Sequence, residues 1–159
     1  MKQNIEPWFF DGEPFTETPE NMAGFCYLIE DKETGRKYIG KKFFWGKRKG
    51  KKVESDWKNY FSSNDDIKFF AKTDKARFKR TILSLHEKER DVNYYEVKFL
   101  FMFGVLEEFF EDGTPVFYNN NISGKYFKHL VHGASERSRL STTPLDASTT
   151  HLRNSERLG

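Results

Sequence analysis

The order of apolar and polar positions predicts a β-hairpin near the start of the chain. Residues 25–30 (FCYLIE) are apolar and aromatic, which is the composition of a strand. Residues 36–40 alternate polar and apolar side chains, as a half-buried strand does. The polar residues 31–35 between them (DKETG) end in glycine and suit a turn. We therefore expect the two strands to pair in antiparallel fashion.

Further along, the pattern predicts a third strand and two helices. Residues 78–85 (FKRTILSL) have the composition of a strand. Before this strand, Asn64 can cap the start of a short helix. Asp91 can cap a longer helix that runs through residues 92–110, until a stretch with Asp, Gly and Pro ends it. The expected fold is an α/β domain with a small, mainly antiparallel three-stranded sheet flanked by helices.

Composition along the chain predicts how the domain is bounded. Residues 1–23 hold three of the five prolines and several acids, and we expect an irregular N-terminal arm. Residues 24–130 should form the folded domain, in which the glycine- and lysine-rich residues 46–52 predict a mobile loop. Residues 131–159 are polar with few apolar anchors, so we expect a tail that is disordered or loosely docked.

The composition also limits where the protein can work. No stretch approaches 18 consecutive apolar residues, which argues against a transmembrane helix. The N-terminus lacks the apolar segment of a secretion signal. The single cysteine, Cys26, has no partner for an internal disulfide. We therefore expect a cytoplasmic protein without membrane partners.

Positive charge is concentrated in one segment. Residues 36–58 contain ten basic and two acidic residues, whereas the first twenty residues contain five acids. Such polarisation attracts phosphate backbones, and aromatic residues interleave the basic run, as they often do at nucleic-acid-binding surfaces. A solvated lysine-rich loop explains the same charge equally well. The candidate DNA contacts are Lys47, Lys49, Lys51, Lys52, Trp57 and Lys58.

The predicted hairpin carries a second candidate feature. Tyr27 and Tyr38 lie in its two strands and can face each other directly or diagonally across the pair. Gly40 removes a side chain where the backbone approaches something closely, and Lys41 and Lys42 follow at once. Two phenols beside two cations can cradle a phosphate or exchange a proton. Cross-strand packing of the tyrosines is the structural alternative.

The long helix places one acid among apolar neighbours. At helical spacing, Glu96 shares a face with Val92, Phe99, Leu100 and Phe103. A carboxylate on an apolar face costs free energy unless it is paired or binds a cation. Glu96 is therefore a candidate ligand for Mg²⁺. A buried salt bridge to a nearby lysine or arginine is an equally good explanation.

Three consecutive asparagines follow this helix, at residues 119–121. They suit a turn, and they can equally hydrogen-bond to the helix acid, a water or a phosphate oxygen. One cysteine and four histidines offer no ligand set with the usual spacing for zinc.

Together these residues resemble one family, the GIY-YIG endonucleases, in particular the phage-encoded type. Residues 38–40 (YIG) match its second triad letter for letter. Residues 25–27 (FCY) keep only the tyrosine of the first triad. Glu96 falls where the metal-binding glutamate of the family belongs, and Asn119 resembles its late asparagine, with Asn121 as the runner-up. The resemblance covers about residues 24–127.

The resemblance implies a metal-dependent DNA endonuclease, a free-standing enzyme of the homing or the DNA-degrading type, acting in the cytoplasm of a host cell. It implies that one Mg²⁺ (or Mn²⁺) per site is held by Glu96, and that the products carry 5′-phosphate and 3′-hydroxyl ends. It places the family's helix arginine at Arg48, although lysines can replace it. The implied catalytic residues are Tyr27, Tyr38, Lys41, Lys42, Arg48, Glu96 and Asn119.

Two other classes of function stay open. The chain can be a GIY-YIG-like module that binds nucleic acid without cutting it, although binding alone does not require Glu96 beside phosphates. It can also be a structural or partner-binding protein in which the tyrosines serve packing.

Overall fold

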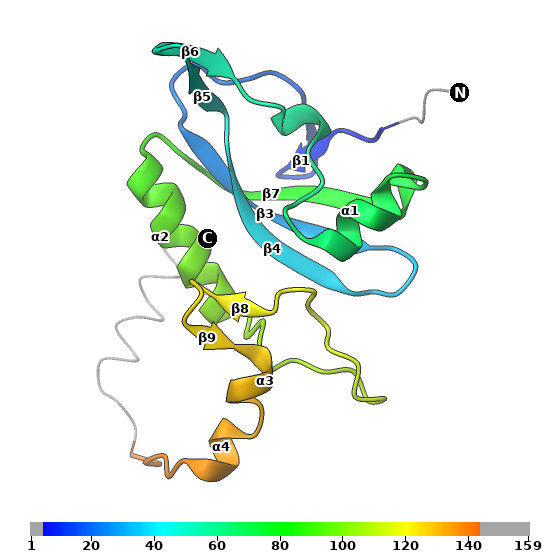
Figure 1. Ribbon diagram of the computed structural model, residues 1–159, viewed down its shortest axis with the longest axis vertical. Coiled ribbons are helices and arrows are strands. Elements are labelled where there is room, and N and C mark those ends of the chain that lie inside the picture. Colours follow the sequence, from blue (N-terminus) through cyan, green and yellow to red (C-terminus); the bar gives the residue numbers. More distant parts are fainter. Residues whose placement is uncertain (1–4, 144–159) are drawn as a thin grey trace.

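A computed structural model describes residues 5–143 and shows an α/β domain built on one mixed sheet (Figure 1). The sheet has five strands in the order β2-β1-β7-β3-β4. Strand β3 lies in its interior, paired with β4 on one side and with β7 on the other, and both pairings are antiparallel. The strands are β1 (Trp8–Phe10), β2 (Glu13–Phe15), β3 (Gly24–Asp31), β4 (Lys37–Phe43) and β7 (Phe78–His86).

The α/β class, the hairpin β3–β4 and the third strand β7 are confirmed, whereas the three-stranded sheet is not. Strand β1 adds to β7 in parallel, and β2 then folds back on β1. The segment expected to be an irregular arm thus contains two strands of the sheet. The reason is the apolar run of β1: Trp8 is buried in the core, and its indole nitrogen donates to the carbonyl of Trp57 over 2.8 Å.

The two main helices cover opposite faces of the sheet. Helix α1 (Asp65–Ala71) begins as predicted at Asn64, whose side chain accepts hydrogen bonds from the backbone nitrogens of Asp66 and Ile67. Helix α2 (Glu89–Met102) packs against β3, β4 and β7. It begins before Asp91, and it ends well before residue 110. Gly104, with φ +58°, turns the chain away just after its end.

The remaining elements are short. The predicted mobile loop at residues 46–52 is instead a two-stranded antiparallel ribbon, because residues on both sides of the Lys49–Gly50 turn form β pairs. Residues 144–159 of the tail expected to be disordered lie outside the described residues. The short elements are β5 (Trp45–Arg48), β6 (Lys51–Glu54), η1 (Trp57–Asn59), η2 (Lys75–Arg77), β8 (Asn121–Ile122), β9 (Tyr126–Phe127), α3 (Lys128–Val131) and α4 (Ala134–Arg137).

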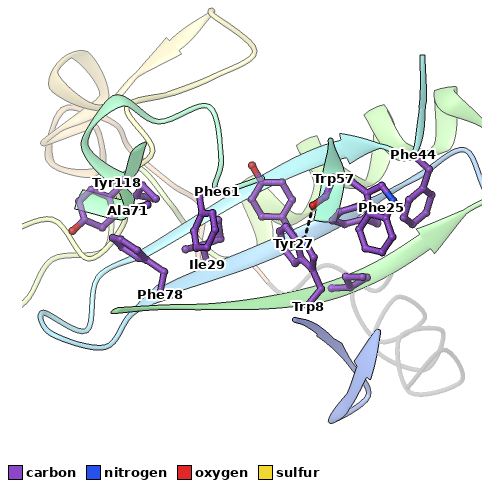
Figure 2. Packing of buried hydrophobic residues seen from close by; sticks show 12 residues of the cluster. Trp8, Phe25, Tyr27, Ile29, Phe44, Trp57, Phe61, Ala71, Phe78 and Tyr118 are labelled. Carbon is purple, nitrogen blue, oxygen red and sulfur yellow. Dashed lines mark hydrogen bonds between the residues drawn. The ribbon is translucent and has the colours of Figure 1, made fainter. Parts of the chain in front are cut away.

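An aromatic core fills the space between the sheet and α1 (Figure 2). Phe25, Tyr27 and Ile29 alternate along β3 and all face this core. The rings of Trp57 and Phe44 meet edge to face 5.1 Å apart. A second, smaller cluster under α2 includes Ile39 and Leu100 on the opposite face.

One buried cation ties this core to the chain around it. Arg80 of β7 is 2% exposed. Its guanidinium donates to the carbonyl oxygens of Glu6 (2.6 Å), Lys58 (3.0 Å) and Tyr60 (2.9 Å). It also lies over the rings of Trp8 and Phe61, at 4.8 and 4.3 Å. Burial lowers the pKa of Arg80 to about 10, so it remains charged at neutral pH.

Gly40 allows the two hairpin tyrosines to approach each other. It lies directly opposite Tyr27, while Tyr38 lies opposite Ile29, so the tyrosines are diagonal neighbours on one face, which is one of the two arrangements expected. A Cβ atom on Gly40 would lie 2.6 Å from Cζ of Tyr27 and 2.9 Å from Cε1 of Tyr38. The Tyr27 ring therefore occupies the space that any larger residue would need.

Replacing Arg80 should destabilise the whole domain. Arg80→Leu leaves three carbonyl oxygens without their donor, so we expect the free energy of unfolding to fall by about 3 kcal/mol or more. Urea denaturation followed by circular dichroism measures it. The adjacent exposed Lys79, changed to leucine, should stay within about 0.5 kcal/mol of the unaltered protein. A similarly small effect at Arg80 would contradict the role assigned to it.

Gly40→Ala should overpack the hairpin. The added methyl group must displace the Tyr27 ring, at an expected cost of about 1–3 kcal/mol in the free energy of unfolding. Gly46→Ala is the matched control, because the nearest atom to its new Cβ is 4.0 Å away. Equal stability of the two variants in thermal denaturation would show that the Tyr27 ring moves aside freely.

Candidate active site

A third tyrosine, Tyr60, lies beside the two tyrosines of the hairpin. The ring of Tyr27 lies 6.2 Å from that of Tyr38 and 6.0 Å from that of Tyr60. Tyr60 follows η1, and its backbone is held by Arg80. The sequence position of Tyr60 does not indicate this proximity, because Tyr60 belongs to a loop outside the hairpin.

The environment favours the protonated form of both hairpin phenols. Tyr27 is 1% exposed, and burial, followed by its neighbours Tyr60 and Tyr38, raises its pKa well above the usual value. Burial also raises the pKa of Tyr38, against a hydrogen bond with Ser63 that lowers it. The Tyr38 hydroxyl lies 3.0 Å from the Ser63 hydroxyl. At neutral pH, therefore, both tyrosines are suited to donating hydrogen bonds rather than accepting protons.

The adjacent lysines of β4 point to opposite faces of the sheet, because side chains alternate along a strand. Lys42 lies over the ring of Tyr60 at 4.1 Å and pairs with Asp56 at 2.6 Å. Lys41 lies on the α2 side, where it donates to Asn93 over 2.7 Å and pairs with Glu96 at 3.5 Å. The two lysines therefore lie at two different sites, Lys42 beside Tyr60 and Lys41 beside Glu96.

Glu96 points from α2 toward the edge strand β4. Its side chain is 22% exposed, and burial raises the pKa of its carboxyl group while Lys41 opposes that rise. The ion pair that the sequence offered as an alternative explanation is therefore present. It is a partly exposed pair, so it leaves carboxylate oxygen accessible from the neighbouring cavity.

A cavity of about 410 Å³ brings Glu96 and Tyr38 together at the edge of the sheet. Its other lining groups are mainly hydroxyl, amide and carboxyl side chains, which are donors that hard cations prefer. Among residues 5–143, no three histidine, cysteine or acidic side chains are grouped so that they could hold a metal ion together. The donor set fits a Mg²⁺ ion bound through one carboxylate, with water and phosphate completing its shell. The polar lining includes Ser63, Asn64, Asp65, Asn119, Asn120, Asn121 and Ser123.

Asn119 is buried, and its amide is bonded to the backbone of β4. Its Oδ1 accepts from the Ile39 nitrogen (3.0 Å) and its Nδ2 donates to the Ile39 carbonyl (2.8 Å). These bonds make Asn119 first of all a residue that holds the edge strand in place beside the cavity. The runner-up, Asn121, also lines the cavity, but its side chain accepts from the backbone of Gly124 in the following turn.

The segment that carries Asn119 is fixed at a buried carboxylate. Asp31, at the end of β3, accepts hydrogen bonds from Tyr118 (2.6 Å) and from two nitrogens of Arg77 (2.8 Å each). Burial alone would raise the pKa of Asp31, but bonds from Arg77, Tyr118 and Thr34 hold it well below its usual value. This arrangement aligns residues 117–119 beside β4.

Other predicted site residues lie away from the cavity. Arg48, where the resemblance places the family's helix arginine, is exposed on β5 and does not line the cavity. Trp57 is 0% exposed, so its ring supports the core and cannot meet DNA in this conformation. Lys58 is exposed and pairs with Glu54 at 3.8 Å. The lysines at positions 47, 49, 51 and 52 are all exposed on the ribbon or its turn.

Among the described residues, no helix has the length and apolar character that crossing a bilayer requires.

Comparison with known proteins identifies the family. Residues 8–122 match a family model described as "Putative endonuclease segE, GIY-YIG domain". Searches of curated proteins and of solved structures gave no match. The matched region runs from β1 to β8 and includes Tyr27, Tyr38, Glu96 and Asn119. Because this match covers most of the chain, the protein belongs to the segE-type GIY-YIG endonuclease family.

Proposed function

We propose that this nuclease domain hydrolyses phosphodiester bonds of DNA, with a divalent metal ion, at the cavity beside β4. The observation that carries the proposal is the meeting of Tyr38 and Glu96 in one polar cavity, although they come from opposite sides of the sheet. Packing alone does not require a carboxylate and a phenol to open into the same cavity. The expected products carry 5′-phosphate and 3′-hydroxyl ends, as the family resemblance implies.

Glu96 would hold one Mg²⁺ or Mn²⁺, which when bound supplies a Lewis acid for the phosphoryl and leaving oxygens. Tyr38, kept protonated by its raised pKa, donates a hydrogen bond that positions a phosphoryl oxygen or the attacking water. Lys41, beside Glu96, adds positive charge where the transition state gains negative charge. Tyr27 is a positioning residue, because it is buried and acts through Tyr38 and Tyr60.

Lys42 and Asn119 complete this assignment in supporting roles. Lys42 lies over the Tyr60 ring, on the face away from Glu96, so its charge acts on the tyrosine cluster. Asn119 sets the position of β4 through its two bonds to Ile39. The family resemblance further supports a free-standing phage enzyme that works in the cytoplasm of a host cell.

A DNA-binding module without catalysis is the second candidate. The Lys41–Glu96 ion pair favours it, since the pair satisfies the carboxylate without a metal ion. Cleavage by variants at Glu96 separates the two functions.

Glu96→Gln should abolish cutting but keep DNA binding. The change preserves the shape of the side chain and removes the charge that binds the cation, so nicking of supercoiled plasmid with Mg²⁺ should fall by about 10²-fold or more. Glu89→Gln, at the exposed start of the same helix, is the matched control and should cut normally. EDTA should stop cleavage by the unaltered protein. If the unaltered protein binds but never cuts with several divalent ions, the binding-module function replaces the nuclease.

The pH dependence of cleavage should respond to Lys41. Cleavage needs ionised Glu96, so the rate should rise with pH through the pKa of this carboxyl group. Lys41 lowers that pKa against the effect of burial, and Lys41→Met should therefore move the rising limb to higher pH. Single-turnover rates from about pH 4 to pH 8 measure the shift. Lys79→Met, on an exposed site of β7, controls for loss of one charge. An unmoved limb in Lys41→Met would exclude Glu96 as the group that titrates.

A further inference from the structure

The ribbon formed by β5 and β6 places like charges face to face. Lys47 is directly opposite Lys52, and Arg48 is directly opposite Lys51. Like charges at directly opposed positions destabilise a strand pair. Two such pairs on a ribbon of four residues per strand are best explained by an anionic partner that lies against them. In Figure 1 the ribbon stands at the top of the molecule, beyond the end of β4.

Alternation gives the ribbon two different faces. One face carries Trp45, Lys47 and Lys52 and is turned toward the protein. Lys52 lies over the Trp45 ring at 4.1 Å, and the Trp45 indole donates to the Met22 carbonyl over 3.2 Å. A pocket of about 630 Å³ on this side is also lined by three acids, Glu20, Glu87 and Glu89, which offset its two lysines.

The other face carries Arg48, Lys51 and Val53 together with Gly46, and it is exposed. Neither cation of this face has a hydrogen bond or ion pair with a side chain in the described part of the chain. Val53 is 37% exposed, an apolar side chain between charged neighbours. This face therefore has the chemistry to meet both anionic and apolar groups.

The base of the ribbon is firmly anchored. Phe44 is fully buried in the core, its carbonyl accepts from the Ser55 nitrogen at 2.8 Å, and the Ser55 hydroxyl donates to the Phe43 carbonyl at 2.6 Å. These bonds close the ribbon where it leaves the domain. Its outer face is thus presented at a fixed orientation relative to β4, as recognition of a duplex requires.

We propose that the β5–β6 ribbon enters the major groove of double-stranded DNA and that Arg48, Lys51 and Val53 contact the base edges. This inference rests on the proposed function only in taking DNA as the partner. The major groove admits a two-stranded ribbon, whereas the minor groove is about half as wide. Arginine and lysine recognise O6 and N7 of guanine, and an apolar side chain contacts the thymine methyl group. Lys49, at the exposed turn of the ribbon, then lies toward the flanking phosphates.

The ribbon also fixes where these bases lie relative to the cut. Arg48 on the ribbon lies ten positions after Tyr38 at the cavity. A fully extended chain spans at most about 33–36 Å over that length, which equals about one turn of B-DNA. Bases read by the ribbon should therefore lie on one side of the scissile phosphate and within about ten base pairs of it.

The test uses the full chain with Glu96→Gln, so that DNA is bound without being cut. Duplexes are selected by binding from a randomised library, and the selected sites are probed by methylation interference at guanine N7 and adenine N3. The ribbon variant is Arg48→Ser with Lys51→Ser. The matched control, Lys79→Ser with Lys98→Ser, removes the same charge elsewhere.

We expect the unaltered ribbon to select guanines whose N7 methylation weakens binding, and the ribbon variant to lose that preference. Affinity for the selected site should fall about 5- to 150-fold relative to the control pair. The melting temperature of the ribbon variant should not fall, because the change removes repulsion between Arg48 and Lys51.

Other outcomes overturn the inference. Base preference that survives the ribbon variant places the reading elsewhere. Interference at adenine N3 alone indicates the minor groove, and equal losses in the ribbon variant and the control pair indicate contact with phosphates only. Plasmid cleavage by the protein without Glu96→Gln separates this inference from the proposed function. Cutting without base preference supports the nuclease function and contradicts the groove contact. N7 interference without cutting supports the groove contact and contradicts the nuclease function.

Discussion

The structure depends on the way in which one buried guanidinium is solvated. Arg80 lies in the centre of the domain, where burying an unpaired charge would cost a large free energy. Three backbone carbonyls accept the hydrogen bonds that its guanidinium would otherwise donate to water. Those carbonyls belong to the N-terminal segment and to the loop that carries Tyr60. One side chain of β7 thus joins two segments that share no local sequence preference, and it places the third tyrosine beside Tyr27.

The edge strand β4 is where the candidate site becomes possible. An interior strand separates the two faces of a sheet, but an edge lets groups from both faces meet. Tyr38 comes from the α1 side and Glu96 from the α2 side, and both line the cavity at this edge. The alternation that sends Lys41 and Lys42 to opposite faces also divides their electrostatic roles.

Patterns with strong local causes were predictable from the sequence. They include the hairpin that brings Tyr27 and Tyr38 onto neighbouring strands, the capping of α1 by Asn64, and Glu96 as an acid at helical spacing from apolar residues. Features that depend on distant partners were not. Strand β1 is too short to show a period and is defined by its pairing with β7. Trp57 lies in the basic segment of the sequence, but hydrogen bonds with Trp8 and Thr18 hold it in the core. The β5–β6 ribbon was not predicted, because its glycine and lysine content is typical of mobile loops.

The bonds from Asn119 to Ile39 have a consequence for the solution behaviour of the protein. Edge strands offer unpaired backbone groups to other chains and can seed edge-to-edge aggregation. At β4, the amide of Asn119 imitates a neighbouring strand, and the chain before it bridges in parallel to Lys37. The opposite edge is the three-residue strand β2, which contains Pro14. The β4 edge is thus capped at Lys37 and Ile39, and the β2 edge is short and interrupted by proline, so both borders of the sheet disfavour the addition of a strand from another chain.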